Sequence, residues 1–156
     1  KKKRVVIISL LLLLVSVIGI SSYFLFKDKI NLLDVDHSAV DWNGKKQKDT
    51  SGEENTIAIP GFEKVTLYAN ETTQAVNFHN PEINDCYFKI SLIHPDGSVL
   101  WISDLIEPGK GMYSIELEKT LAVGEYENAV LKYECFSLND QSPLNGSEIN
   151  LKLVVV

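Results

Sequence analysis

The sequence predicts an immunoglobulin-like antiparallel β-sandwich, an all-β fold, preceded by a single N-terminal transmembrane helix. Three observations support this prediction. Residues 5–26 form a run without a charged side chain, and residues 56–156 are divided into short runs rich in Val, Ile, Tyr and Phe. Turn residues separate these runs every 8 to 12 positions or so, about the spacing typical of sandwiches and barrels. A domain of about 100 residues also matches the immunoglobulin-like size.

The charge-free run 5–26 is long enough to cross a membrane. At about 1.5 Å per helical residue it would extend roughly 33 Å, and a hydrocarbon core is about 30 Å thick. The basic residues 1–4 precede it, which favours a cytoplasmic N-terminus and an extracellular domain in the cell membrane. The alternative is a secreted protein released by signal cleavage near Gly19, Ser21 and Ser22.

The chain then divides into four predicted parts. They are a cytoplasmic basic flank (1–4), a transmembrane anchor (5–26), an extracellular linker (27–55) and a β-sandwich ectodomain (56–156). The linker is polar and has no sustained helical or strand periodicity, and its apolar positions are expected to form a short helix or turn resting on the membrane or on the domain.

The aspartates of the linker do not form an EF-hand loop. Such a loop needs Gly at its sixth position and Glu at its twelfth. Counted from Asp34, these positions hold Ala39 and Lys45. We therefore predict no bound metal there.

Charge is distributed unevenly along the chain. The net charge is −6, but residues 56–156 hold six Lys against fourteen acidic residues. A domain this acidic is repelled by phosphate backbones, so we predict no binding of nucleic acid.

Eight strands are expected in the ectodomain. Their predicted ranges are 56–59, 64–68, 74–78, 86–93, 99–102, 112–117, 125–136 and 149–155. The turn at residues 95–98 should join the fourth and fifth strands, because its Pro fixes φ and its Gly accepts a positive φ. Alternation predicts one buried and one solvent-exposed face for most strands, with Tyr113 on a buried face. Tyr126, at the start of a strand, is expected to form a tyrosine corner.

The two cysteines are predicted to form a disulfide. Cys86 opens the fourth strand and Cys135 closes the seventh, and these strands would be antiparallel neighbours C and F of an immunoglobulin-like order. The oxidising side of the membrane would favour the bond. Two separate buried thiols are the alternative, since Cys behaves as a small hydrophobic residue.

No set of residues with catalytic spacing is visible, so we predict neither an enzyme nor a bound cofactor. The three histidines, His37, His79 and His94, lack metal-ligand spacing, and His79 and His94 are interpreted as loop-edge residues beside turns. No Ser lies in a nucleophile elbow.

Several short runs resemble a known family. They are residues 57–62, 78–82, 84–88, 96–97, 105–110 and 142–146. Together they are similar to small, uncharacterised proteins exported by Gram-positive bacteria, over about 100 residues. The resemblance implies a membrane-anchored β-sandwich on the bacterial surface and supplies no catalytic or ligand-binding residue.

Three functions are consistent with the sequence. The first is a non-enzymatic module that recruits or assembles a protein partner at the cell surface. The second is a carbohydrate- or peptidoglycan-binding module, with Tyr87 and Trp101 as the candidate aromatic residues, and the third is an inhibitor of extracellular proteases. Loops can vary without disturbing the core, so binding is expected in residues 139–147 and 80–85. The candidate residues there are Asn80, Asp85, Asn139, Asp140, Pro143, Asn145 and Gly146.

Overall fold

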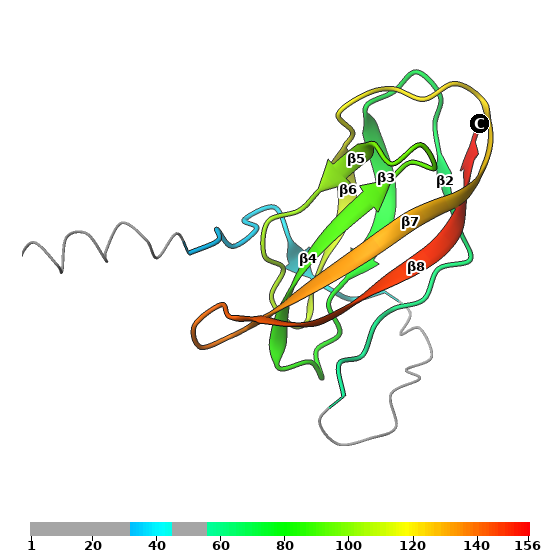
Figure 1. The fold of residues 1–156 in the computed structure, drawn as a ribbon. Coiled ribbons are helices and arrows are strands. Elements are labelled where there is room, and N and C mark those ends of the chain that lie inside the picture. Colours follow the sequence, from blue (N-terminus) through cyan, green and yellow to red (C-terminus); the bar gives the residue numbers. More distant parts are fainter. Residues whose placement is uncertain (1–31, 45–55) are drawn as a thin grey trace, which may run out of the picture. The chain divides into compact units, whose positions relative to one another are not determined.

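The computed structural model describes residues 32–44 and 56–156, and these residues form two packed β-sheets (Figure 1). The predicted anchor, residues 5–26, lies outside them, as do the linker residues 27–31 and 45–55. Residues from Leu33 to Val156 belong to one compact unit.

One sheet has five strands and the other has three. The five-stranded sheet has the order β2-β8-β7-β4-β5, from Lys64–Leu67 (β2), Pro143–Val155 (β8), Gly124–Ser137 (β7), Cys86–Ile93 (β4) and Val99–Ile102 (β5). The three-stranded sheet has the order β1-β6-β3, from Val40–Asp41 (β1), Lys110–Glu116 (β6) and Thr73–His79 (β3). All pairs are antiparallel except β2 with β8.

The core lies between the sheets and is formed by every second side chain of the strands. Phe88, Ile90 and Leu92 of β4 are fully buried, and Leu131 and Tyr133 of β7 pack beside them. These are the faces that alternation predicts. Aromatic contacts join the two sheets, since the ring of Phe78 in β3 stacks on that of Trp101 in β5, with centroids 5.8 Å apart.

Most predicted strands are confirmed. β4 and β5 have the predicted bounds, and β7 is longer by one residue at each end. The predicted turn between β4 and β5 is also present, with Gly97 at φ 87°. The tyrosine corner is confirmed, because the Tyr126 hydroxyl donates to the Ala122 carbonyl at 2.9 Å.

Three predictions about secondary structure are wrong. Residues 56–59 form no strand, because the Asn84 side chain takes both main-chain groups of Ala58, accepting from its N–H at 2.7 Å and donating to its carbonyl at 2.9 Å. β8 begins six residues before the predicted start at Ile149. Tyr113 is 38% exposed, because two residues of β3 stand opposite it in a β-bulge and shift the register.

Part of the predicted linker belongs to the compact unit. Val40 pairs with Gly111 and Asp41 with Lys110, so the linker supplies the edge strand β1. Val35 forms a parallel bridge with Leu105. We call residues 33–44 the strap, because they cross the unit before residues 45–55.

Candidate functional site

The two predicted binding loops lie at the same end of the unit. Cys86, which follows residues 80–85, pairs with Ser137, which precedes the β7–β8 turn. Asn139 and Asp140 lie exposed in that turn, and Asp85 is exposed in the other loop. The structure therefore brings together two segments that are about fifty positions apart in the sequence, as an antiparallel β4–β7 pair requires.

Pro143, Asn145 and Gly146 do not lie in a loop, which corrects the prediction. They belong to β8, and residues 132–148 form a long hairpin that we call the β7–β8 arm (Figure 1). Between the pairs Tyr133–Ser147 and Cys135–Leu144, β8 carries one residue more than β7, so the arm contains a β-bulge. A Cβ at Gly146 would lie 2.2 Å from the Tyr133 carbonyl oxygen, so only glycine fits.

A hollow of about 340 Å³ lies at this bulge. Its apolar lining comes from Phe136, Pro143 and Leu144, and Lys132, Glu134 and Glu148 contribute charged side chains. Lys132 and Glu134 form an ion pair at 3.5 Å, and Glu148 has no ion-pair partner among residues 32–44 and 56–156. The hollow is therefore an apolar recess beside an unpaired carboxylate.

Asn80 is unavailable for binding, contrary to the prediction. It is fully buried, and its amide donates to the carbonyls of Cys86 at 2.8 Å and Ile106 at 2.9 Å. Asn84 in turn donates to the Asn80 side-chain oxygen at 2.8 Å. The two side chains form a buried network that fixes the base of the 80–85 loop and leaves Asp85 as its exposed candidate.

Gln141 fastens the beginning of the strap to the arm. Its side-chain oxygen accepts from the Leu33 N–H at 2.6 Å, and its amide donates to the Leu33 carbonyl at 3.0 Å. Gln141 has φ 54°, so the turn holds it in the left-handed region. Sequence reasoning missed this residue, because a Gln in a turn carries no signal for a partner 108 positions away.

An aromatic stack fastens the other end of the strap. The Trp42 ring lies parallel to His79 (centroids 4.0 Å apart) and to Tyr113 (5.2 Å). Gly111 makes room for it, since a Cβ there would lie 2.7 Å from the indole. The Tyr113 hydroxyl donates to the Asn43 side chain at 2.8 Å. His79 is therefore the buried end of β3, only 5% exposed, rather than the predicted loop-edge residue.

The buried His79 predicts that stability depends on pH. Burial lowers the pKa of His79 below its ordinary value of 6.5, while a main-chain contact with Asn77 offsets part of this effect. The unfolded chain then binds more protons than the folded chain below about pH 6.5, so the free energy of unfolding should fall as the pH drops through that range. Urea unfolding of the full chain in mild detergent between about pH 5 and 8 would measure this.

The matched variants for this pH dependence are His79→Asn and His37→Asn. His79→Asn should flatten the dependence between about pH 5 and 7, because the titrating group is gone. His37 is exposed in the strap, so its variant should keep the wild-type profile. A wild-type profile in His79→Asn would contradict the assignment.

Cys86 and Cys135 face the core together, as predicted, but the structure contains them as free thiols. They lie at diagonal positions, since Cys86 pairs with Ser137 and Cys135 with Phe88. Their thiols form a hydrogen bond, which lowers the pKa of Cys86 and, together with burial, raises the pKa of Cys135. The disulfide is therefore absent from the structure, although both side chains are in contact.

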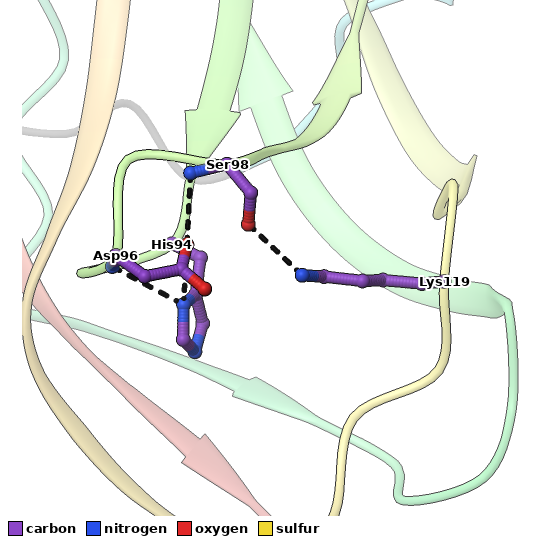
Figure 2. Close-up of polar contacts among 4 residues, drawn as sticks. All are labelled: His94, Asp96, Ser98 and Lys119. Carbon is purple, nitrogen blue, oxygen red and sulfur yellow. Dashed lines mark hydrogen bonds and ion pairs between the residues drawn. The ribbon is translucent and has the colours of Figure 1, made fainter.

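A polar cluster at the opposite end of the unit stabilises the β4–β5 turn (Figure 2). The Asp96 carboxylate accepts from the Ser98 N–H at 2.8 Å and lies 2.9 Å from Nδ1 of His94. Lys119 Nζ donates to Ser98 Oγ at 2.9 Å. Hydrogen bonds from Ser98, and then His94, hold the pKa of Asp96 well below its usual range. An exposed ammonium that donates to Ser98 cannot remove its proton, so the cluster supports a turn rather than nucleophilic chemistry.

The candidate aromatic residues for glycan binding are not exposed platforms. Trp101 is 7% exposed and belongs to the core, and Tyr87 is half-buried. Sequence reasoning did not identify Trp42 as a residue of the site, because Trp42 lies in a segment interpreted as a linker.

Comparison of the chain with family models, with curated proteins and with solved structures finds no match. The resemblance to exported Gram-positive proteins therefore stays a prediction. Within residues 32–44 and 56–156, no helix is long and apolar enough to cross a membrane.

Proposed function

We propose that this chain is a single-pass membrane protein with a cytoplasmic N-terminus, whose extracellular β-sandwich recruits a protein partner without catalysing a reaction. The charge-free run 5–26 and its basic flank support the topology. The order β8-β7-β4-β5, with β6 beside β3, supports an immunoglobulin-like sandwich, in which strands G, F and C are neighbours and E pairs with B.

The contact between Gln141 and Leu33 is the observation that carries this proposal. It ties the β7–β8 turn to the point where the chain enters the compact unit. Only residues 27–32 then separate the predicted anchor from this contact, and six residues span at most about 20 Å. If residues 5–26 anchor the chain as proposed, the end with Asn139, Asp140 and Asp85 would lie near the outer surface of the membrane, and the partner would be another membrane protein or a complex assembled there.

Charge indicates the chemistry of the partner. The strap adds Asp34, Asp36 and Asp41 to the acidic domain, so residues 33–44 and 56–156 together hold six Lys against seventeen acidic residues. A net charge of −11 favours association with a basic surface and opposes binding to anionic polymers. The carbohydrate alternative is weaker because Trp101 is buried. The inhibitor alternative is weaker because residues 143–147 belong to strand β8 rather than to a free loop.

Photo-crosslinking on living cells tests the proposed function. A photoreactive amino acid at Asn139, Asp140 or Asp85 should capture one specific protein, because these positions share an end of the unit. The same probe at Lys119, at the opposite end, should not capture it. Adducts with glycan alone would support the carbohydrate alternative, and the absence of adducts from all three positions would overturn recruitment at this end.

The proposed extracellular location leads to a prediction for Cys86 and Cys135. On the oxidising side of the membrane the two contacting thiols should form a disulfide that closes a loop of about 50 residues, worth up to roughly 4 kcal/mol. Diagonal positions lie about 7–8 Å apart between Cα atoms, somewhat beyond the usual range, so β4 and β7 must draw together. We therefore expect a gain of only about 2 kcal/mol.

Urea unfolding of exported protein with and without a reducing agent measures this gain. The control is Cys86→Ser, whose unfolding should not respond to reduction. Recovery of both cysteines as free thiols by non-reducing peptide mapping would rule out the bond.

A further inference from the structure

We propose that the outer edge of β8 at residues 147–151 binds an extended, cationic segment of the partner protein as an added β-strand. This inference rests on the proposed function and names the contact through which recruitment occurs. Strand addition uses main-chain hydrogen bonds for affinity and side-chain contacts for specificity.

The outer edge of β8 is open over most of its length. β7 pairs with β8 from Pro143 to Val155, but β2 pairs only with Lys152–Val155 on the other side. No strand among the described residues pairs with the outer edge before Lys152. The arm therefore offers a sheet edge in the compact unit.

Alternation identifies the groups that point outward. Lys152 N–H donates to the Glu63 carbonyl at 3.0 Å, so its main-chain groups face the outer edge. In an antiparallel ladder, alternate residues face the same edge, so the main-chain groups of Asn150 and Glu148 also point outward. Among the described residues, no strand pairs with them on the outer side, and no main-chain hydrogen bond from a turn or loop reaches them. They form the pattern that an incoming strand requires.

The chain itself diverts the strand that would cover this edge. Continuing the register Lys64–Lys152 backwards would place Pro60 beside Glu148. Pro60 has no N–H to donate, and its carbonyl instead accepts from the buried Tyr133 hydroxyl at 3.2 Å. Phe62 turns toward the core and packs edge-on against Phe78. The segment before β2 thus forms no strand pair with residues 147–151 of β8.

Only part of the edge is protected against pairing. Natural proteins block exposed edges with proline and with β-bulges. Pro143 and the bulge at Gly146 protect the beginning of β8, whereas residues 147–151 pair regularly with β7 and carry neither device. The open window is therefore confined to these five positions.

The side chains around the window favour a cationic occupant with an apolar residue. Glu148 has no ion-pair partner among the described residues, while its neighbour Lys132 is paired with Glu134. A Lys or Arg opposite Glu148 would form a cross-strand ion pair. The hollow lined by Phe136, Pro143 and Leu144 adjoins the window and would take one apolar side chain.

Binding of a short peptide that alternates lysine and valine to the full chain in nanodiscs tests this inference. We expect binding at physiological ionic strength, with slower hydrogen exchange at Glu148 and Asn150. The same peptide N-methylated at every residue keeps the charge but loses its main-chain donors, so it should bind at least about tenfold more weakly. Equal affinity of the two peptides, or binding of neither, would overturn the inference.

A pair of variants tests the edge from the side of the protein. Asn150→Pro removes an outward N–H without an internal hydrogen bond and should weaken peptide binding about fivefold, whereas Asn150→Ala should stay within about twofold. Equal peptide affinities of the two variants, both folded, would overturn strand addition. If the proline variant unfolds, the comparison with the N-methylated peptide provides the test instead. If the two peptides bind equally well but a photoreactive probe at Asp140 still captures a specific protein on cells, the proposed recruitment would stand. Binding at the β8 edge would then be excluded.

Discussion

Asn80→Ala is expected to lower the free energy of unfolding by about 3–5 kcal/mol, because it removes three buried side-chain hydrogen bonds. The carbonyls of Cys86 and Ile106 each lose a donor, and the Asn84 amide loses the acceptor that it contacts at 2.8 Å. All these groups lie in the buried base of the 80–85 loop, where water cannot replace the lost bonds at low cost.

Urea unfolding of the full chain in mild detergent, followed by tryptophan fluorescence, measures this loss. Trp101 is a suitable reporter because it is buried against Phe78. The matched control is Asn139→Ala, which removes an exposed side chain in the β7–β8 turn and should change stability by less than about 0.5 kcal/mol. If both alanine variants show an equally small decrease in the free energy of unfolding, the buried network does not stabilise the fold.

The sequence was sufficient to predict the strands in which apolar and polar residues alternate strictly. β4 shows this, because Phe88, Ile90 and Leu92 alternate with polar or smaller residues, and the Pro-Asp-Gly turn ends the hairpin. Period-two patterning reports which face is buried, and the register then follows from it. The pairing of β4 with β7, and with it the contact between the two thiols, was therefore predictable.

Bulges and side-chain networks caused the errors. In the β-bulge of the β3–β6 pair, two residues of β3 stand opposite Tyr113, and Tyr113 is exposed there although it fits the pattern of Ile115. The run 56–59 has strand composition, but Asn84 satisfies the main chain of Ala58 in place of a neighbouring strand. Neither effect has a local signature in the sequence.

The candidate site was only partly predictable for the same reason. The exposed positions Asn139, Asp140 and Asp85 follow from turn chemistry and strand order. The contact of Gln141 with Leu33 depends on long-range packing, and so does the stack of Trp42 on His79. Short segments that fold only against the rest of a domain carry little local pattern, which is why the strap resembled a linker.

Trp42→Ala is expected to lower the free energy of unfolding by about 3 kcal/mol and to loosen the strap. The indole contacts His79 at 4.0 Å and Tyr113 at 5.2 Å between ring centroids, and it covers the bare main chain at Gly111. Its removal leaves a slot lined by two rings. The loss of stability should be at the lower end of the range for replacing Trp by Ala. The side chain is only half-buried, and its Nε1 has no hydrogen-bond partner among the described residues.

Hydrogen exchange of the full chain in nanodiscs separates this local effect from global unfolding. In Trp42→Ala, the amides of β1 should exchange faster, while those of β4 and β7 stay protected under native conditions. Trp42→Phe keeps a stacked ring and should retain most of the protection. Unchanged exchange in β1 of the alanine variant would show that the pairs Val40–Gly111 and Asp41–Lys110 hold the strap without the indole.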